Sequence, residues 1–416
     1  MAERFTVLMV DKYHFVKGGA ERYMFELTAL LESQGHRVIP FAMHHPANRP
    51  TDWERYFVSH ASFGGDGPVS LWKAPRLFVR AVYNLEARRA LQALLREVRP
   101  DVAHLHMIDH QISPSILPVL SAARIPILQT VHHYKAICPS YRLYNERTGQ
   151  ICERCVGRTT WHALRARCHK GSLLSSTALA LESAIHRLSR SDRRIDLYHT
   201  PSRFAAGKLE EGGLDPGRIR TFFYAIDVES RRFRREATRD LVYFGRLSPE
   251  KGLLTLLEAM RKLPGRELEI AGEGPLRPTL EQRVRQLELR NVRFLGGLET
   301  RALEEVVGNA RLAIVPSEWH ENSPLAIYEA FALGTPVVAS RAGGIPELVR
   351  EGETGALFER GDATELARKI EELFRDPQRL AAMRARCRAL AERELDWGVH
   401  YPRIEGCYRE LIARRS

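Results

Sequence analysis

The chain has 416 residues, of which 44% are hydrophobic and 27% charged. This length predicts two domains, and the proportions exclude a disordered or fibrous protein. The net charge of +12 favours anionic partners such as phosphorylated small molecules, acidic lipids or nucleic acid. No apolar run reaches the roughly 18–20 residues that span a bilayer, and MAERFTVLMV is typical of a first strand rather than a signal peptide, so we expect a cytoplasmic protein.

The N-terminal half alternates short apolar strands with helical patterns. Strands are predicted at 6–10, 36–42, 100–106 and 125–133, and helices at 19–35 and 78–98. Gly35 is expected to end the first helix as a left-handed residue. This alternation predicts βαβ units around a parallel sheet.

A Cys-rich insertion without clear periodicity, residues 134–175, interrupts the alternation. A helix at 172–189 and a strand at 195–202 follow it. From residue 241 the alternation resumes and continues to TPVVAS (335–340), which predicts a second doubly wound domain.

We therefore predict an α/β protein with two Rossmann-like domains that face each other across a cleft. The first comprises residues 1–222 with the C-terminal helix 395–416, and the second comprises residues 223–394. Ligands of such sheets bind beyond the carboxyl ends of the strands, so the cleft is the expected site.

Two glycines, Gly18 and Gly19, lie between the first strand and the first helix. Glycines there let the backbone approach a ligand, and the helix N-terminus offers N–H groups to a phosphate. An ordinary βα turn would also explain them. The G-x-G-x-x-G fingerprint is absent, which argues against a standard NAD site.

Two cations follow the first strand of the second domain in FGRLSPEKG (244–252). Arg246 and Lys251 near one strand end suit a diphosphate, although each alone is also typical of a solvated surface. The turn AGEGP (271–275), with Gly272 and Glu273, ends another strand. We interpret this turn as mostly architectural. Because it lies at a strand end, Gly272 and Glu273 are also candidate contacts of the donor.

The segment EWHENSPLAIYEA (318–330) places one carboxylate before a helix and a second inside it. Ser323 is predicted as the N-cap and Pro324 as the first helical residue, so that the helix N-terminus favours an anion in the cleft. Glu321 would stand beside that anion, and Glu329 about 1.5 turns into the helix. Ordinary helix-surface acids would fit the same positions. Carboxylates that bind a sugar and a ribose, with a diphosphate between them, would suit a nucleotide sugar.

Over nearly its whole length the chain resembles glycosyltransferase family 4, which has the GT-B fold and a retaining mechanism. The resemblance rests on KGGAER, PDVAHLH, TVHHYKAICP, TPSRF, FGRLSPEKG, AGEGP, ENSPLAIYEA and LGTPVVASRAGGIPELV. It implies that the first domain holds the acceptor and the second a UDP- or GDP-type donor. The resemblance implies that Glu321 and the backbone of Pro324, Leu325 and Ala326 hold the transferred sugar and that Glu329 binds the ribose. It also implies that Arg246, Lys251 and Gly19 contact the diphosphate and that His132 lies near the donor sugar.

Three positions depart from the family pattern. Ser323 and Pro324 stand where Phe and Gly are common, and His133 stands where an aspartate often follows the histidine. Tyr224 and Ala225 replace the usual Asn-Gly pair. The sugar and the acceptor, which the resemblance leaves as a glycan, a lipid-linked molecule or a small molecule, therefore stay open.

Cys138, Cys152, Cys155 and Cys168 form the pattern C-x13-C-x2-C-x12-C. This spacing favours a structural zinc site with four thiolates, with free thiols or disulfides as the alternatives. His162 and His169 are substitute ligands, and Cys387 and Cys407 show no pattern. We expect catalysis itself to need no cofactor.

Two further hypotheses concern partners. Cations beside apolar residues in LWKAPRLFVR (71–80) suit peripheral contact with an anionic membrane, and a solvated helix face suits them as well. A nucleic-acid-binding protein with the cysteines as its finger is an alternative, but basic residues interleaved with aromatics are lacking around the cysteines, so we expect no nucleic acid. An epimerase or phosphorylase on the same donor site is the other alternative, although no acid–base pair for an epimerase stands out.

Overall fold

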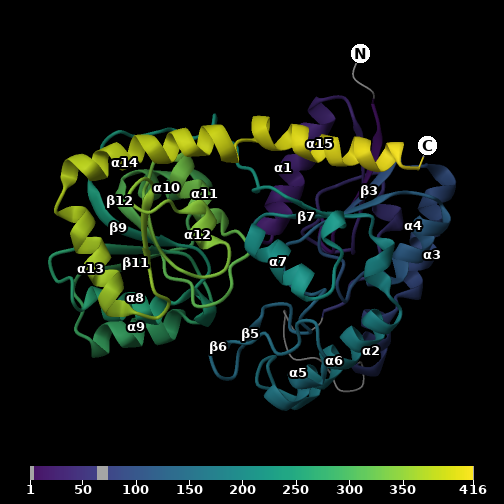
Figure 1. Cartoon of the computed structure of the whole chain (residues 1–416), viewed down its shortest axis with the longest axis horizontal. Helices are drawn as coiled ribbons and strands as arrows, with labels where there is room; N and C mark the ends of the chain where they lie inside the picture. Colours follow the sequence, from purple (N-terminus) through teal and green to yellow (C-terminus); the bar gives the residue numbers. More distant parts are fainter. Residues whose placement is uncertain (1–3, 63–73, 416) are drawn as a thin grey trace.

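The computed structural model describes residues 4–62 and 74–415, which form two α/β domains side by side (Figure 1). Each domain is built on a six-stranded sheet in which every strand pairing is parallel. Strands that are fully buried, such as β3 (Val102–Leu105) and β13 (Val337–Ser340), are mostly apolar, as expected where helices cover both sides of a sheet. The predicted fold class is confirmed.

The N-terminal sheet has the strand order β2-β1-β3-β4-β7-β8. Its other strands are β1 (Thr6–Val10), β2 (Arg37–Phe41), β4 (Ile127–Thr130), β7 (Leu197–Thr200) and β8 (Ile219–Thr221). Its helices are α1 (Gly19–Ser33), α2 (Ala74–Val82), α3 (Leu85–Glu97), α4 (Leu117–Ala122), α6 (Leu173–Leu188) and α7 (Arg203–Glu211). As predicted, Gly35 follows α1 with a left-handed φ of 85°.

The C-terminal sheet has the order β11-β10-β9-β12-β13-β14. Its other strands are β9 (Arg239–Phe244), β10 (Leu268–Ala271), β11 (Val292–Gly296), β12 (Ala310–Val315) and β14 (Gly355–Phe358). Its helices are α8 (Leu253–Met260), α9 (Arg277–Gln286), α10 (Thr300–Gly308), α11 (Leu325–Ala332), α12 (Ile345–Leu348), α13 (Ala363–Phe374) and α14 (Pro377–Leu390).

The chain returns to the first domain at its end. A π-helical turn, Ala391–Leu395, joins α14 to α15 (Trp397–Ala413), and the two helices run along one side of both domains (Figure 1). Helix α15 packs on β3 and β4, and His104 of β3 bonds the Tyr408 hydroxyl at 2.7 Å. The C-terminal helix therefore completes the packing of the first sheet.

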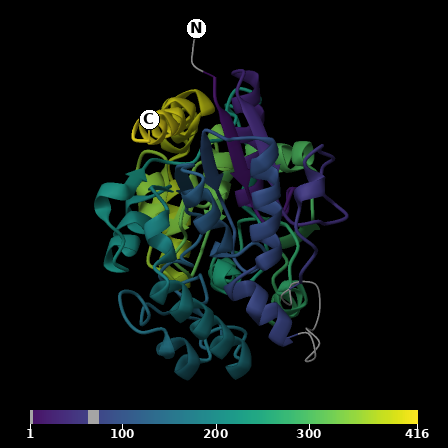
Figure 2. The same cartoon turned by 90° about the vertical axis from the view of Figure 1, so that its right-hand side faces the viewer.

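The Cys-rich insertion lies at the opposite end of the N-terminal domain from α15 (Figure 2). It contains the two-residue strands β5 (Tyr144–Asn145) and β6 (Gln150–Ile151), which pair antiparallel, and α5 (Trp161–Ala166). Helix α5 packs on α6, and α6 packs on α2.

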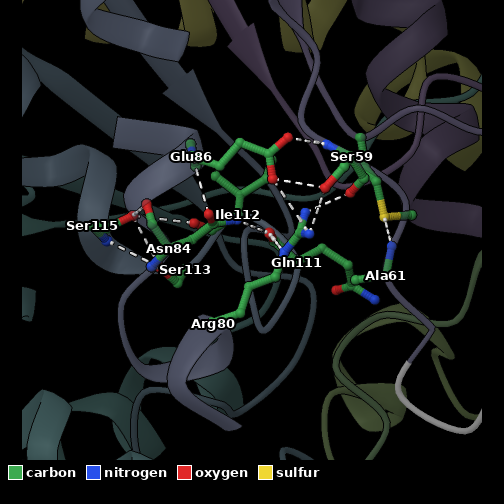
Figure 3. A network of polar contacts seen from close by, with 11 residues as sticks. Ser59, Ala61, Arg80, Asn84, Glu86, Gln111, Ile112, Ser113 and Ser115 are labelled. Carbon is green, nitrogen blue, oxygen red and sulfur yellow. Dashed lines mark hydrogen bonds and ion pairs between the residues drawn. The ribbon is translucent and has the colours of Figure 1, made fainter. Parts of the chain in front are cut away.

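The single helix predicted at 78–98 is wrong, because α2 and α3 are separate helices. Asn84 breaks the pattern: its side chain accepts a bond from Ala87 N at 3.1 Å and caps α3, while its amide donates to Gln111 O at 2.6 Å. Figure 3 shows the polar network around this break, in which Arg80 bonds Ser59 and faces Glu86 at 3.4 Å. The apolar pattern of a helix continues through residue 84, so the pattern alone did not reveal that Asn84 caps a new helix.

Candidate functional site

The loops that follow the strand ends of the two sheets meet between the domains. A Cβ atom placed on Gly19, at the start of α1, would lie 2.8 Å from Leu325 Cδ1 at the start of α11. The Asn322 amide donates to Val131 O, after β4, at 2.6 Å. Both contacts join the N-terminal domain to the segment that carries the two predicted glutamates.

Glu321 and Lys251 form an ion pair in this region. Lys251 Nζ lies 2.6 Å from Glu321 Oε1, which also accepts from Ser317 Oγ at 2.7 Å. The Glu321 residue is 5% exposed. Burial alone would raise the pKa of this carboxyl, but the charge of Lys251 and the hydrogen bonds from Lys251 and Ser317 hold it below its ordinary value. Glu321 is therefore a carboxylate at neutral pH.

Arg246 lies on the same loop as Lys251 but is exposed. Within the described residues its side chain has no ion pair or hydrogen bond, and its backbone carbonyl accepts from the Tyr243 hydroxyl at 2.9 Å and from Ser248 N at 3.1 Å. A guanidinium in this state is available to an anionic ligand.

The prediction that Ser323 caps the helix and Pro324 is its first residue is wrong by one position. Helix α11 begins at Leu325, and Pro324 is the N-cap residue with an extended backbone. The Ser323 hydroxyl instead bonds the Tyr328 hydroxyl at 2.5 Å. The N–H groups of Leu325 and Ala326 still open the helix, so an anion-binding helix terminus at this edge remains.

Glu329 lies in α11, as predicted, and forms an ion pair with Arg22 of α1. Its side chain is 13% exposed and that of Arg22 39% exposed. The pair joins the two domains, with Gly18 and Gly19 at the start of the same helix α1.

The structure places the partly buried His132 in a row of aromatic side chains that includes the buried His106 and Tyr224. His106 Nδ1 lies 2.9 Å from His132 Nε2, and the Tyr224 hydroxyl lies 2.9 Å from His132 Nδ1. Because this hydroxyl also donates to Val131 O at 2.9 Å, it accepts from His132 Nδ1–H, which leaves Nε2 to accept from His106. Burial, and then the neighbouring His106, holds the pKa of His132 well below its ordinary value, so the ring is neutral.

The turn with Gly272 and Glu273 supports the Arg246 loop. A Cβ on Gly272 would lie 2.0 Å from Gly245 O, and its φ is 143°. Leu247 N donates to Glu273 O at 3.0 Å, whereas the Glu273 carboxylate pairs with Arg277. The contacts of these two residues are thus architectural in this structure.

A cavity of about 560 Å³ opens beside His132 in the N-terminal domain. We call it the N-terminal cavity. It borders His133, which pairs with Asp109 at 2.6 Å, and Lys135, which pairs with the buried Glu182 at 2.9 Å. Its other basic lining residues are Arg158, His186, Arg187, Arg190 and Arg193.

Sequence reasoning missed Arg22, His106, Asn322 and the role of Tyr224. The departure from the family pattern at Tyr224 was visible, but its contact with His132 was not. Arg22 and Glu329 are 307 positions apart, so no local pattern joins them. Asn322 could have been noted as a polar residue next to Glu321.

Comparisons with known proteins give the fold and the family. The glycogen synthase of Mycobacterium tuberculosis is 26% identical over 404 residues, covering 92% of this chain and 88% of that protein. A GDP-mannose-dependent alpha-(1-6)-phosphatidylinositol monomannoside mannosyltransferase of Mycolicibacterium smegmatis is 30% identical over 235 residues, or 52% and 60% of the two chains.

Solved structures match across the whole chain. Sucrose-phosphate synthase of Thermosynechococcus elongatus has a TM-score of 0.73 at 21% identity, covering 99% of this chain and 100% of that chain. Anabaena HepE, solved with UDP and glucose, has a TM-score of 0.69 at 18% identity, covering 98% and 100%. These likenesses show the GT-B fold.

Two family models account for most of the sequence. The model "Glycosyl transferases group 1" matches residues 227–392. The model "Glycosyltransferase Family 4" matches residues 17–230, more than half of the chain. With the paired strand-end loops described above, these matches identify the chain as a GT-B glycosyltransferase that belongs to glycosyltransferase family 4.

Proposed function

We propose that this glycosyltransferase moves a sugar, with retention of its anomeric configuration, from a UDP- or GDP-type nucleotide sugar to a glycan, lipid-linked or small-molecule acceptor. The observation that carries the proposal is the grouping at one edge of the C-terminal sheet. There, the Lys251–Glu321 ion pair stands just before α11, and Arg246, whose side chain has no partner among the described residues, lies on the same loop as Lys251. The named relatives and neighbours that use GDP-mannose or bind UDP support this donor class.

In this mechanism the leaving diphosphate takes part in the transfer. The bond between the anomeric carbon and the diphosphate oxygen breaks, and its electron pair leaves on the diphosphate. The acceptor hydroxyl oxygen bonds the carbon from the same face, and its proton passes to the diphosphate. Arg246, Lys251 and the first N–H groups of α11 would stabilise the leaving charge, which is the main catalytic contribution.

The other residues would position the substrates. Glu321, a buried carboxylate, would accept hydrogen bonds from the sugar hydroxyls, and Glu329 would exchange its bond with Arg22 for one with the ribose. Neutral His132 would present a rigid face to the donor sugar because His106 and Tyr224 hold both ring nitrogens. The N-terminal cavity would receive the acceptor.

The test is a panel of UDP- and GDP-sugars incubated with the enzyme, with nucleotide release and the product configuration followed by NMR. We expect slow hydrolysis of one donor without an acceptor and an α-configured product from an α-linked donor. An inverted product would overturn the mechanism, and the absence of turnover with every nucleotide sugar would overturn the donor class.

We further propose that the enzyme works at the anionic inner face of a membrane. No helix in the described residues is long and apolar enough to cross a membrane, so contact would be peripheral. Helices α2, α5 and α6 pack together at one end of the N-terminal domain (Figure 1). They expose Val79, Trp161, Leu174 and Leu188, which are 51–83% exposed, near the exposed cations Arg76, Arg165, Arg167 and Arg190. Apolar and basic groups together suit acidic lipid.

One part of the originally predicted patch does not contribute to this surface. Residues 71–73 lie outside the described residues, and Arg80 faces inwards in the network of Figure 3. Vesicles with and without anionic lipid test the proposal. Leu174→Ser with Leu188→Ser should weaken binding to anionic vesicles, and Leu254→Ser, an exposed leucine of the C-terminal domain, should not. Equal binding of all proteins to both vesicles would contradict membrane docking.

A further inference from the structure

Four thiols from separate parts of the Cys-rich insertion surround one small cavity. Cys138, Cys152, Cys155 and Cys168 all line it, and none of them is in a disulfide. The cavity holds about 10 Å³, which is room for about one water-sized sphere. A single ion would fill the cavity that these four side chains line.

Tyr134, Ile137, Cys138 and Leu143 anchor the start of the insertion in the core of the N-terminal domain, but the part beyond Leu143 has only a small apolar core of its own. The cluster of buried side chains inside it consists of Cys155, Ala163, Ala166, Cys168 and, from α6, Ala180. Alanine and cysteine side chains are small, so their burial removes little apolar area from water and contributes little to stability. Its regular structure is two strands of two residues and one helix of six. A segment of this kind needs an additional cross-link, supplied in small units by disulfides or a metal.

We propose that Cys138, Cys152, Cys155 and Cys168 bind one structural zinc ion as four thiolates. Four sulfur ligands with a C-x2-C pair suit tetrahedral Zn²⁺, which takes Zn–S distances of about 2.3 Å. Each thiol gives up its proton to solvent as its sulfur binds the metal, and no electron is transferred. His162 also lines the cavity, but four sulfurs complete the coordination without it.

Zinc binding requires a local adjustment. The described residues contain no group of three or more His, Cys, Asp or Glu side chains already arranged around a metal position. The thiols therefore have to turn from the walls towards the centre of the cavity. The Cys138 thiol, for example, is directed to the Ser140 hydroxyl, 3.3 Å away, and would exchange this weak contact for the metal.

The position of the insertion gives the metal a consequence for the donor site. Arg142 lies 3.9 Å from Glu250, which precedes Lys251, and Glu153 lies 2.8 Å from His320, which precedes Glu321. Both contacts cross from the insertion to the C-terminal domain. A metal that fixes the insertion would therefore also hold the loops on which Lys251 and Glu321 lie.

Elemental analysis of the purified full chain tests the site without reference to activity. We expect about one zinc per chain in the wild type and a loss of most of it in Cys152→Ser. Cys407→Ser, which changes a buried cysteine of α15 outside the cluster, should keep its zinc. Replacement of the metal by cobalt(II) should give the thiolate charge-transfer absorption of a tetrahedral site, which a variant that fails to fold cannot mimic.

Chelation provides a second measurement on the unmodified protein. Removal of zinc should make the four thiols reactive towards a thiol reagent and should expose the insertion to limited proteolysis between residues 134 and 175. A wild-type protein that contains no zinc and shows four freely reactive thiols, or two disulfides by mass, would overturn the proposal. Zinc content and thiol reactivity are measured without donor or acceptor, so these results and the test of the proposed function can fail independently.

Discussion

The two domains differ in how they carry charge where their strand-end loops meet. On the C-terminal side, Arg246, Lys251 and Glu321 are charged groups on loops after β9 and β12. On the N-terminal side, the buried His106 and the partly buried His132 are neutral and stack on each other, and His132 also stacks on Tyr224. Both sides use the carboxyl ends of parallel strands, so the difference lies in the side chains rather than in the backbone.

This difference indicates a division of tasks. Charge that develops in a transition state is stabilised best by preorganised groups of opposite sign, and on the C-terminal side Arg246 and Lys251 are such groups for the leaving diphosphate. A neutral, hydrogen-bonded histidine row has a fixed shape and excludes water but adds no charge. We therefore expect substitutions on the C-terminal side to lower turnover and those in the histidine row to act mainly on stability.

The largest effect is expected when the leaving-group cations are removed. Arg246→Ala and Lys251→Ala should each lower kcat by about 10²-fold or more, because preorganised charge at the diphosphate is lost. Steady-state kinetics with the preferred donor measures this. Arg290→Ala, an exposed arginine of the same domain, is the control and should leave kcat unchanged. A double variant with near-normal kcat would remove the basis for the charge comparison.

The second effect concerns Glu321, which connects the charge to the sugar. Glu321→Gln should lower kcat strongly, because sugar orientation matters most in the transition state, and the shape of the side chain is kept. Lys251→Ala should also raise the pKa of Glu321, since the cation that lowers it is gone. The pH–kcat profile of Lys251→Ala should therefore fall at a higher pH on its acidic side than that of the wild type. Superimposable acidic limbs would contradict the coupling.

More of the fold than of the candidate site could be predicted from the sequence. Strand periodicity and the left-handed Gly35 were sufficient for two parallel-sheet domains. The break at Asn84 was missed because a side-chain cap can interrupt a continuous apolar pattern without any glycine or proline. The start of α11 was predicted one residue too early for a similar reason: the Ser323 hydroxyl bonds the Tyr328 hydroxyl and does not cap the helix backbone.

The site could be predicted only where its residues are close in sequence or match a family motif. Lys251 and Glu321 were each predicted to lie in the site, but the sequence did not show that they pair with each other. His106 and His132 meet because β3 and β4 are adjacent strands, and their contact depends on the pairing of His104 with Leu128 in the register. Arg22 reaches Glu329 from the other domain, which no local pattern records.

The third prediction tests the neutral row through pH. Burial is the main cause that lowers the pKa of His104, His106, His132, His199 and His400, with His199 at about 4. As the pH falls through about 6.5, the unfolded chain binds protons that the folded chain does not, so the free energy of unfolding falls by up to about 1.4 kcal/mol per pH unit for each histidine.

Three carboxyls whose pKa is raised by burial, those of Asp11, Glu21 and Glu26, oppose this trend. Burial, and then Glu21, raises the pKa of Asp11 to about 8, so its contribution to stability is greatest at low pH and is lost as the pH rises towards 8. The five histidines outweigh these three carboxyls between pH 7 and 5. The midpoint of urea unfolding should be clearly lower at pH 5 than at pH 7. The dependence of this midpoint on pH should be weaker in His104→Gln than in His60→Gln, which changes an exposed histidine and serves as the control. A midpoint independent of pH would show that the row is not kept neutral.

The smallest expected effect concerns the ion pair that spans the cleft. Glu329 should contact the ribose equally in the ground state and the transition state, so Glu329→Gln should raise the donor KM by about tenfold, or roughly 1.4 kcal/mol, and leave kcat nearly unchanged. Arg22→Gln removes only the partner of Glu329 in the unliganded protein and frees its carboxylate for the ribose, so the donor KM should stay the same or fall. Glu32→Gln, an exposed change at the end of α1, is the control. If Arg22→Gln raised KM as much as Glu329→Gln, the ion pair itself would set the donor site, and the N-terminal side would share the charge that we assign to the C-terminal side.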